Sequence, residues 1–299
     1  MAEFKSGFIS IVGRPNAGKS TLLNALIGSK VAIVTDKPQT TRESITAVLT
    51  EDDYQLIFVD TPGIHKPKHE LGSRMNQSAY SQLHGVDLIY YIVDANTDLG
   101  KGDTFVVDKL KSIKTPVILV LNKVDTVKQQ DLLEKIVEMR ALYDFAEVVP
   151  LSALTSHNLD TLIDVSLTYM TDNLMYYPKD TVAAYPEQFI IAEIVREKII
   201  NLTQEEIPHS VAVAIEKMTQ KQSSLLINAV IFVNRESQKG MIIGKQGSMI
   251  KEIGTQARKE LEVIMGQPVY LESYVRVEKN WRNRDRLLNQ LGYIEIEKE

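Results

Sequence analysis

The chain has 299 residues, enough for about two domains, and 44% hydrophobic with 24% charged residues is typical of a folded protein. It lacks cysteine, which excludes disulfides and thiolate metal sites, and no apolar run is long enough to span a bilayer. The net charge is −5, but residues 1–188 hold 18 basic and 24 acidic residues, whereas residues 189–299 hold 16 and 15. The acidic average therefore does not exclude nucleic-acid binding by the second half.

The first half alternates between strand and helix patterns. Short apolar runs predict strands at residues 8–12, 45–49, 54–59, 88–93, 117–121 and 148–151. Helical periodicity predicts helices at residues 20–26, 103–113, 130–143 and 159–170. Such alternation predicts an α/β domain over residues 1–175, with a mainly parallel sheet and helices on both faces.

The first predicted strand is followed by GRPNAGKS, which fits the phosphate-loop pattern G-x-x-x-x-G-K-[ST]. Its glycines let backbone N–H groups surround phosphate oxygens, Lys19 can reach the β- and γ-phosphates, and the Ser20 hydroxyl can bind Mg²⁺. The helix that begins here also points its N-terminus at the phosphates. We expect nucleotide contacts from this loop and the next residue: Gly13, Pro15, Asn16, Ala17, Gly18, Lys19, Ser20 and Thr21.

The sequence Asp-Thr-Pro-Gly ends the third predicted strand. Asp60 at its start can hold Mg²⁺ through water, and the Gly63 N–H at its end can contact the γ-phosphate. Alone, this sequence is equally typical of an ordinary turn. The phosphate loop that precedes it favours the nucleotide-site interpretation.

The fifth predicted strand ends in Asn-Lys-Val-Asp. Guanine carries two N–H donor groups on one edge that a carboxylate can accept, and adenine lacks this pair, so Asp125 is predicted to select guanine. Asn122 would brace the loop, and the stem of Lys123 would cover the base. After the next strand, Ser152 and Ala153 would offer N–H groups to the base oxygen. A solvated polar loop is the alternative for these segments taken alone.

Residues 176–188 contain two prolines and no sustained periodicity, which predicts a linker. The elements after it follow the order α-β-β-α-α-β: residues 189–202, 210–219, 225–233, 239–243, 249–265 and 269–277. We therefore predict a smaller α+β domain over residues 189–278. Its long helix places five apolar residues on one face: Ile250, Ile253, Ala257, Leu261 and Ile264.

A G-x-x-G loop lies between the last two helices of this domain. K-homology (KH) domains clamp the backbone of about four nucleotides with such a loop, although a bare G-x-x-G is more often a simple connection. The element order, which resembles a type II KH fold, favours RNA binding here. The expected RNA-binding residues are Lys239, Gly244, Lys245, Gln246, Gly247 and Lys251.

A helical tail is predicted over residues 279–299. It holds Trp281, Arg282, Arg284 and Arg286, a mixture of aromatic and basic residues that can contact nucleic acid. An amphipathic helix packed on the small domain explains the same residues equally well, so both interpretations stay open.

The order GRPNAGKS, PQTTR, DTPG, NKVD and SA resembles the translation-factor class of bacterial GTPases and, within it, the Era family, over nearly the whole chain. The resemblance implies GTP or GDP, Mg²⁺ and K⁺ as bound groups, with K⁺ beside Asn16. It makes residues 39–43 switch I, with Thr41 as a Mg²⁺ ligand beside Ser20 and Asp60. Lys19, Thr41 and Gly63 would be the catalytic residues.

Ras-like enzymes carry a glutamine directly after Asp-x-x-Gly that orients the attacking water. This chain has Ile64 there, whose side chain cannot hydrogen-bond. We therefore expect slow intrinsic hydrolysis.

The resemblance also implies a function, a GTP-hydrolysing switch that binds the single-stranded 3′ end of 16S ribosomal RNA during assembly and maturation of the 30S subunit. We expect a cytoplasmic protein, because no secretory signal pattern begins the chain, and we also expect a monomer. The resemblance adds peripheral contact with the inner face of the cell membrane. One alternative is a signalling GTPase whose small domain recruits a protein. Another is an ATPase with a nucleic-acid module, against which Asp125 argues.

Overall fold

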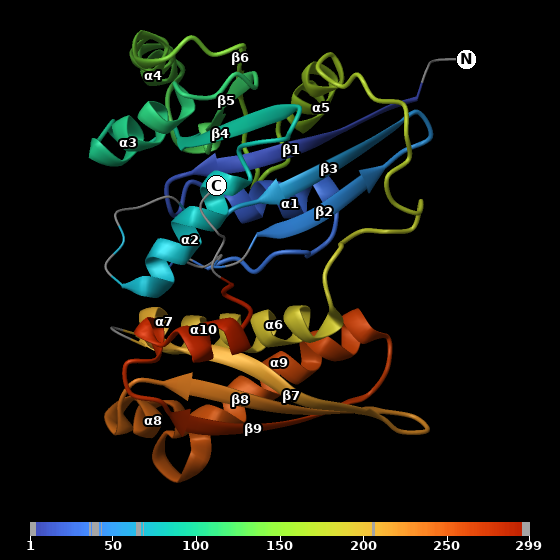
Figure 1. Cartoon of the computed structure of the whole chain (residues 1–299), viewed down its shortest axis with the longest axis vertical. Coiled ribbons are helices and arrows are strands. Elements are labelled where there is room, and N and C mark those ends of the chain that lie inside the picture. Colours follow the sequence, from blue (N-terminus) through green and yellow to red (C-terminus); the bar gives the residue numbers. More distant parts are fainter. Residues whose placement is uncertain are drawn as a thin grey trace.

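The computed structural model contains two separate sheets, one in each half of the chain (Figure 1). It describes residues 4–35, 37, 42, 44–63, 67, 69–204 and 207–294. The larger sheet has six strands in the order β2-β3-β1-β4-β5-β6, and only β2 runs antiparallel to its neighbour. The predicted, mainly parallel sheet is thus confirmed. Its strands are β1 (Lys5–Gly13), β2 (Ile45–Thr50), β3 (Tyr54–Asp60), β4 (Leu88–Asp94), β5 (Val117–Asn122) and β6 (Glu147–Pro150).

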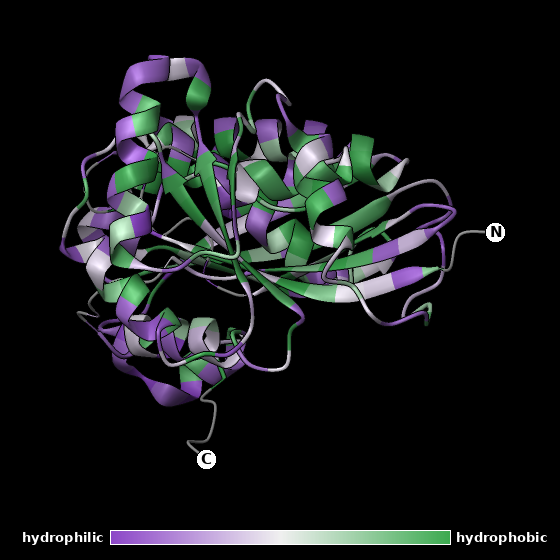
Figure 2. Cartoon of the chain, turned by 90° about the horizontal axis from the view of Figure 1, so that it is seen from above, coloured by the Kyte–Doolittle hydropathy of each residue, from purple (hydrophilic) through white to green (hydrophobic). Residues whose placement is uncertain are grey.

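Helices cover both faces of this sheet, as predicted. One core cluster joins the sheet to α1 (Lys19–Ile27) and α5 (Leu159–Leu167). A second cluster, on the opposite face, joins it to α2 (Glu70–Ser81), α3 (Lys101–Leu110) and α4 (Gln129–Leu142). Figure 2 shows the resulting contrast, with hydrophobic central strands and helices of mixed hydropathy around them.

Helix α2 was not expected from the sequence. Its buried residues include the polar Arg74 and Asn76 alongside Leu71, Met75 and Ala79. Buried polar groups interrupt the apolar period by which a helix is recognised, and these contacts arise only from distant parts of the chain.

The smaller sheet has three strands, β7 (Ala212–Gln220), β8 (Leu225–Val233) and β9 (Val269–Val277), with β8 antiparallel to β7 and parallel to β9. Its helices are α6 (Glu187–Leu202), the short α7 (Ile207–Ser210), α8 (Glu236–Ile243) and α9 (Ser248–Met265). The order α-β-β-α-α-β is confirmed with α7 added. The predicted apolar face of α9 is shorter than expected, because Ile253, Ala257 and Leu261 are buried whereas Ile264 is 41% exposed.

The predicted linker lies along the edge of the larger sheet. The N–H of Val48 in β2 donates to the carbonyl of Val182 (2.9 Å), and the N–H of Ala184 donates to the carbonyl of Thr46 (3.0 Å). The segment thus extends the sheet's hydrogen bonding before the chain enters α6.

The tail is not one helix on the small domain, as one interpretation expected. It forms a 3-10 turn (Trp281–Asn283) and a short helix, α10 (Asp285–Gln290), that lie between the two domains (Figure 1). Trp281 is fully buried, and its indole N–H donates to the carbonyl of Ser210 at 2.8 Å. It shares an apolar cluster with Leu71 and Met75 of α2, so packing against both domains fixes the tail.

Within the described ranges, no helix is both long and apolar enough to cross a membrane.

Candidate functional site

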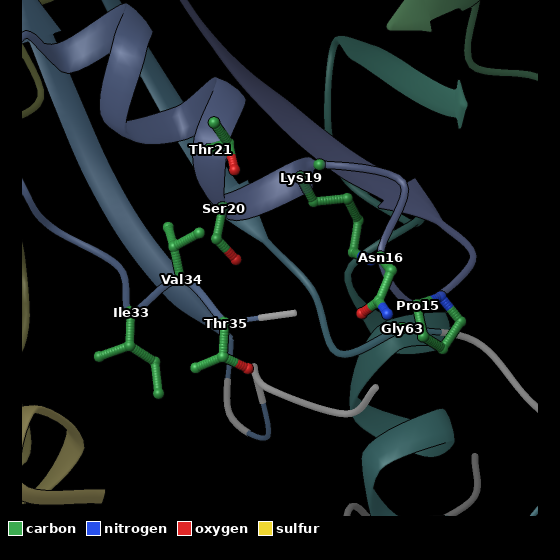
Figure 3. A pocket seen from close by; sticks show the side chains of 10 residues that line it. Pro15, Asn16, Lys19, Ser20, Thr21, Ile33, Val34, Thr35 and Gly63 are labelled. Carbon is green, nitrogen blue, oxygen red and sulfur yellow. The ribbon is translucent and has the colours of Figure 1, made fainter. Parts of the chain in front are cut away.

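The phosphate loop joins β1 to α1 and curls around the amino group of Lys19 (Figure 3). That buried Nζ donates to the carbonyls of Gly13 (3.3 Å) and Arg14 (3.0 Å). Burial lowers the pKa of Lys19, and the Asp60 carboxylate partly opposes this shift. A buried ammonium encircled by carbonyls gains from an anion placed beside it, which is what a nucleotide's phosphates supply.

Gly18 cannot be replaced without moving the loop. It has φ +95°, and a Cβ built there would lie 2.2 Å from the Nδ2 of Asn122. The glycine of the phosphate-loop pattern is thus required by a close approach between this loop and the end of β5.

Hydroxyl and carboxylate oxygens meet beside the loop. The Ser20 hydroxyl donates to Oδ2 of Asp60 at 3.0 Å, and Asp60 is fully buried at the end of β3. Hard oxygen donors of these two kinds are the ligands that Mg²⁺ prefers in proteins. The residues present therefore fit the ion, and Ser20 and Asp60 would hold it.

Gly63 lies against the phosphate loop. A Cβ at Gly63 would be 3.0 Å from both Cγ and N of Pro15, so a side chain there would press on the loop. Lys19, Ser20 and Gly63 line the same pocket, with Thr35 on its wall (Figure 3). The structure thus brings together the residues predicted to surround the terminal phosphate.

Asn122 links three segments at the predicted base-binding side. Its Nδ2 donates to the carbonyl of Ala17 (3.0 Å), and its Oδ1 accepts the N–H groups of Lys123 (2.8 Å) and Ala153 (3.0 Å). The amide therefore braces the phosphate loop, the loop after β5 and the loop after β6 against one another. Asp125 follows in an exposed turn (Val124–Thr126).

The predicted N–H donors of Ser152 and Ala153 are both used within the protein. The Ser152 N–H donates to the carbonyl of His157 at 3.1 Å, and that of Ala153 donates to Asn122. A contact with the base oxygen would have to share one of these hydrogens. Sequence position alone could not show this competition.

Two ion pairs that hold the phosphate loop were missed in the sequence. Arg14 bonds to Asp103 at 2.8 Å across 89 residues of chain, and Lys123 bonds to Asp94 at 2.6 Å and to the carbonyl of Asn16 at 3.0 Å. Asp103 and Asp94 belong to no local pattern. The alignment of β4 with β1 and β5 brings Asp94 to the loop, and the helix after β4, α3, brings Asp103.

Of the predicted switch I segment, residues 39–43, the structure describes Arg42 alone, and Thr41 and Ile64 lie outside the described residues. Arg42 is buried and donates to the carbonyls of Val211 (2.6 Å) and Pro208 (3.0 Å) in the small domain. Its guanidinium lies over the ring of Trp281, 5.9 Å from the ring centroid. The motif PQTTR and the predicted switch I both include Arg42, but neither had predicted its contact with the small domain.

Helix α2, the next helix after Asp-Thr-Pro-Gly, is bonded to the tail through a buried arginine, as Arg42 is bonded to the small domain. Arg74 donates to Asp285 (2.7 Å), to Asn289 (2.6 Å) and to the carbonyl of Tyr293 (2.7 Å). The segments next to the phosphate pocket are therefore directly bonded to the small domain and its tail.

The G-x-x-G loop occupies the turn between α8 and α9. Gly244 has φ +73°, and a Cβ there would lie 2.7 Å from Cβ of Met249, whereas Gly247 has φ +78° with open space around it. Lys245, Gln246 and Lys251 are exposed, and Lys239 is half-buried on α8. The six predicted RNA-binding residues thus gather around this turn.

Comparison with known proteins agrees with both sites. A family model described as 50S ribosome-binding GTPase matches residues 8–123, and a KH domain model matches residues 206–282. One similar solved structure is a variant of Aquifex aeolicus Era bound to GDP and AlF₄⁻. Another is Era in complex with MgGDPNP and nucleotides 1506–1542 of 16S ribosomal RNA. Each is 40% identical and has a TM-score of 0.94, over 97% of this chain and 99% of its own.

The phosphate loop, Ser20 and Asp60 lie in the first matched range, residues 8–123, and the G-x-x-G turn lies in the second. The predicted GTPase, its nucleotide and Mg²⁺, and the KH domain are confirmed by these matches. The chain belongs to the Era family, and its enzymatic activity is the hydrolysis of GTP.

Proposed function

We propose that this chain is a GTP-controlled switch that binds the single-stranded 3′ end of 16S ribosomal RNA while the 30S subunit is assembled and matured. The observation that carries the proposal is the similarity, over 97% of the chain, to an Era bound to nucleotides 1506–1542 of that RNA. We propose that it acts on this RNA in the cytoplasm, as a monomer. The peripheral membrane contact implied by the resemblance stays a prediction.

At the nucleotide site, the phosphate loop and Thr21 bind the phosphates, and Asp125 selects guanine through its exposed carboxylate. Lys19 is already oriented by the loop carbonyls, so it neutralises charge on the transferred phosphoryl group without a large rearrangement. When bound, Mg²⁺ would supply further stabilisation of this negative charge. Thr41 completes its ligand set with Ser20 and Asp60, and Asn16 holds K⁺.

Hydrolysis is slow without a partner because the residue after Gly63 is Ile64, which offers no side-chain hydrogen bond to orient water. A partner, or the ordering of the switch segments, would supply that orientation. Purified protein that hydrolysed GTP at the speed of a fully activated GTPase would contradict this part of the proposal.

In the KH domain, the backbone of residues 244–247 clamps the RNA, and Lys239, Lys245 and Lys251 neutralise its phosphates. Gly247→Asp is the sharper test variant, because Gly247 has open space around it whereas any side chain at Gly244 would collide with Met249. Aspartate also tolerates the left-handed backbone of this position better than most residues.

The test is RNA crosslinking in cells with the protein held in its GTP-bound form. We expect recovery of 16S 3′ ends with the wild type and their loss with Gly247→Asp. Lys221→Gln, an exposed lysine in the turn between β7 and β8, is the matched control and should recover them normally. Absence of 16S 3′ ends from the wild type, or recovery of a protein in their place, would refute the proposal.

A further inference from the structure

A polar hollow opens in the small domain away from the G-x-x-G turn. Its volume is about 430 Å³, and its wall is made by the chain directly after β8 and directly after β9. These strands are parallel, so their carboxyl ends meet at one edge of the sheet, next to α8 (Figure 1). The N–H of Glu278 donates to the carbonyl of Val233 at 2.8 Å, which holds the two strand ends together.

Positive charge dominates the lining of this hollow. Arg235, Lys279 and Arg282 contribute three cationic side chains against the carboxylate of Glu236. Arg235 and Lys279 are exposed, and within the described part of the chain neither forms an ion pair. A concave surface with unpaired cations concentrates anions.

Other basic residues of the small domain and its tail differ in this respect. Arg258, Arg276 and Arg284 each bond to a carboxylate, at 3.0, 3.3 and 3.2 Å. Their charges are partly satisfied within the protein. Arg235 and Lys279 have no such carboxylate partner among the described residues, and they differ from other exposed lysines of this domain in lining a concave surface. The third cation, Arg282, already donates to the carbonyl of His209 at 3.3 Å.

The backbone beneath these cations is fixed by a buried amide. Gln238 is 5% exposed, and its Oε1 accepts the N–H groups of Asn234 (2.9 Å) and Arg235 (3.2 Å). Its Nε2 donates to the Ser210 hydroxyl at 2.9 Å. The position of Arg235 is thus preorganised, which lowers the entropy cost of binding.

The hollow and the G-x-x-G turn lie at opposite ends of α8. Eight residues of helix span about 12 Å, and Lys239, four residues after Arg235, shares its side of the helix and lies between the two ends. A KH turn holds only about four nucleotides. A longer strand must therefore continue past it, and Lys239, the basic residue of α8, lies between the turn and the hollow.

From the position of this hollow, with Arg235 and Lys279 on its wall and Lys239 between it and the turn, we propose that it binds a backbone phosphate of the same RNA strand, outside the nucleotides held by residues 244–247. The inference rests on the proposed function and adds a second RNA contact to it. Because the contact is with phosphate, it increases the affinity for RNA without adding sequence specificity.

The test compares two single-stranded RNAs from the 16S 3′ end, one of about four nucleotides and one about twice as long. In the double variant with Arg235→Gln and Lys279→Gln, we expect roughly tenfold weaker binding of the longer RNA and unchanged binding of the shorter one. The dependence of log affinity on log salt should become shallower by about 0.7 for the longer RNA. Lys221→Gln, an exposed charge in the turn between β7 and β8 outside the hollow, is the matched control and should change neither.

Equal weakening for both lengths, equal weakening by the control, or no weakening would overturn the inference. The inference would also be overturned if the double variant bound RNA normally but bound vesicles of anionic phospholipid more weakly than the wild type does. The hollow would then be a lipid site. If Gly247→Asp left wild-type affinity for both RNAs intact, the proposed function itself would fail. If Gly247→Asp abolished binding but the double variant bound normally, only the hollow's role would fail.

Discussion

The two loops that carry the chemistry of this protein are supported in opposite ways. The phosphate loop is held by buried side chains from distant elements, among them Asn122 at the end of β5 (2% exposed) and Asp103 on α3 (3% exposed). The G-x-x-G turn presents Lys245 and Gln246 to solvent, and its shape comes from two glycines with positive φ. One site depends on preorganised side-chain geometry, whereas the other depends on backbone shape and charge.

This difference predicts how each site responds to mutation. Removal of one brace at the nucleotide site leaves several buried groups without partners, and each such group costs about 1–3 kcal/mol. Removal of one lysine at the RNA loop costs only that residue's own contact with phosphate. The expected effects therefore decrease from the braces to the surface charges.

The largest effect is expected for Asn122→Ala. The substitution removes the partners of the Ala17 carbonyl and of the Lys123 and Ala153 N–H groups. We expect affinity for GTP, measured by titration, to fall at least about 100-fold, which corresponds to about 3 kcal/mol. RNA affinity of the nucleotide-free protein should not change.

Asn96→Ala is the control, because Asn96 is exposed in the loop after β4 and should bind GTP normally. An Asn122→Ala variant with nearly normal affinity for GTP would show that the three segments keep their places without the amide. The contrast between the two loops would then be wrong.

The next effect concerns Arg42, which belongs to neither loop and joins the two domains. Arg42→Met leaves the carbonyls of Val211 and Pro208 without their donor, and both contacts are buried. We expect the free energy of unfolding to fall by about 2 kcal/mol, with the domains unfolding in separate calorimetric transitions. Arg140→Met, an exposed change on α4, should leave the unfolding curve unaltered. A single wild-type-like transition in Arg42→Met would contradict the anchoring role.

Arg42 also illustrates what the sequence could and could not predict. The strands, most helices and the nucleotide motifs follow from local periodicity and fixed spacings, so they were predicted within a few residues. The contacts of Arg42, Arg74 and Trp281 join residues far apart in the chain and leave no local signal. Helix α2 was missed for the same reason, because its inner face buries polar groups whose partners lie in the tail.

Smaller effects are expected at the RNA loop. Lys245→Gln and Lys251→Gln each remove one exposed charge, so we expect each to weaken RNA binding by severalfold and to leave the melting temperature unchanged. GTP hydrolysis should also be normal, because neither residue lies near the phosphate pocket. A large loss of stability in either variant would show that these lysines also hold the turn together.

The smallest effect is expected from acid at the second contact between the domains. Lys30, which follows α1, bonds to Glu197 at 2.7 Å and to Glu260 at 2.6 Å, and Lys198 also pairs with Glu260. Burial alone would raise the pKa of Glu260, but the hydrogen bonds and charges of Lys198 and Lys30 outweigh it and hold that pKa below its usual value. Glu260 thus contributes stability that is present above its usual pKa of 4.5 and lost as the pH falls through its lowered value.

We expect this contribution to be under about 1 kcal/mol, because the ion pairs are partly exposed and screened by salt. Glu260→Gln should be slightly less stable at neutral pH, and its stability should fall less on acidification, as measured by denaturant unfolding at several pH values. Glu262→Gln is the control, because it keeps Glu260 and loses only its own pair with Arg258. Its stability should fall on acidification as that of the wild type does. If Glu260→Gln and the wild type lost stability in parallel on acidification, the contact would be held by shape and by the Val34 N–H bond to Glu197, and charge would add nothing measurable.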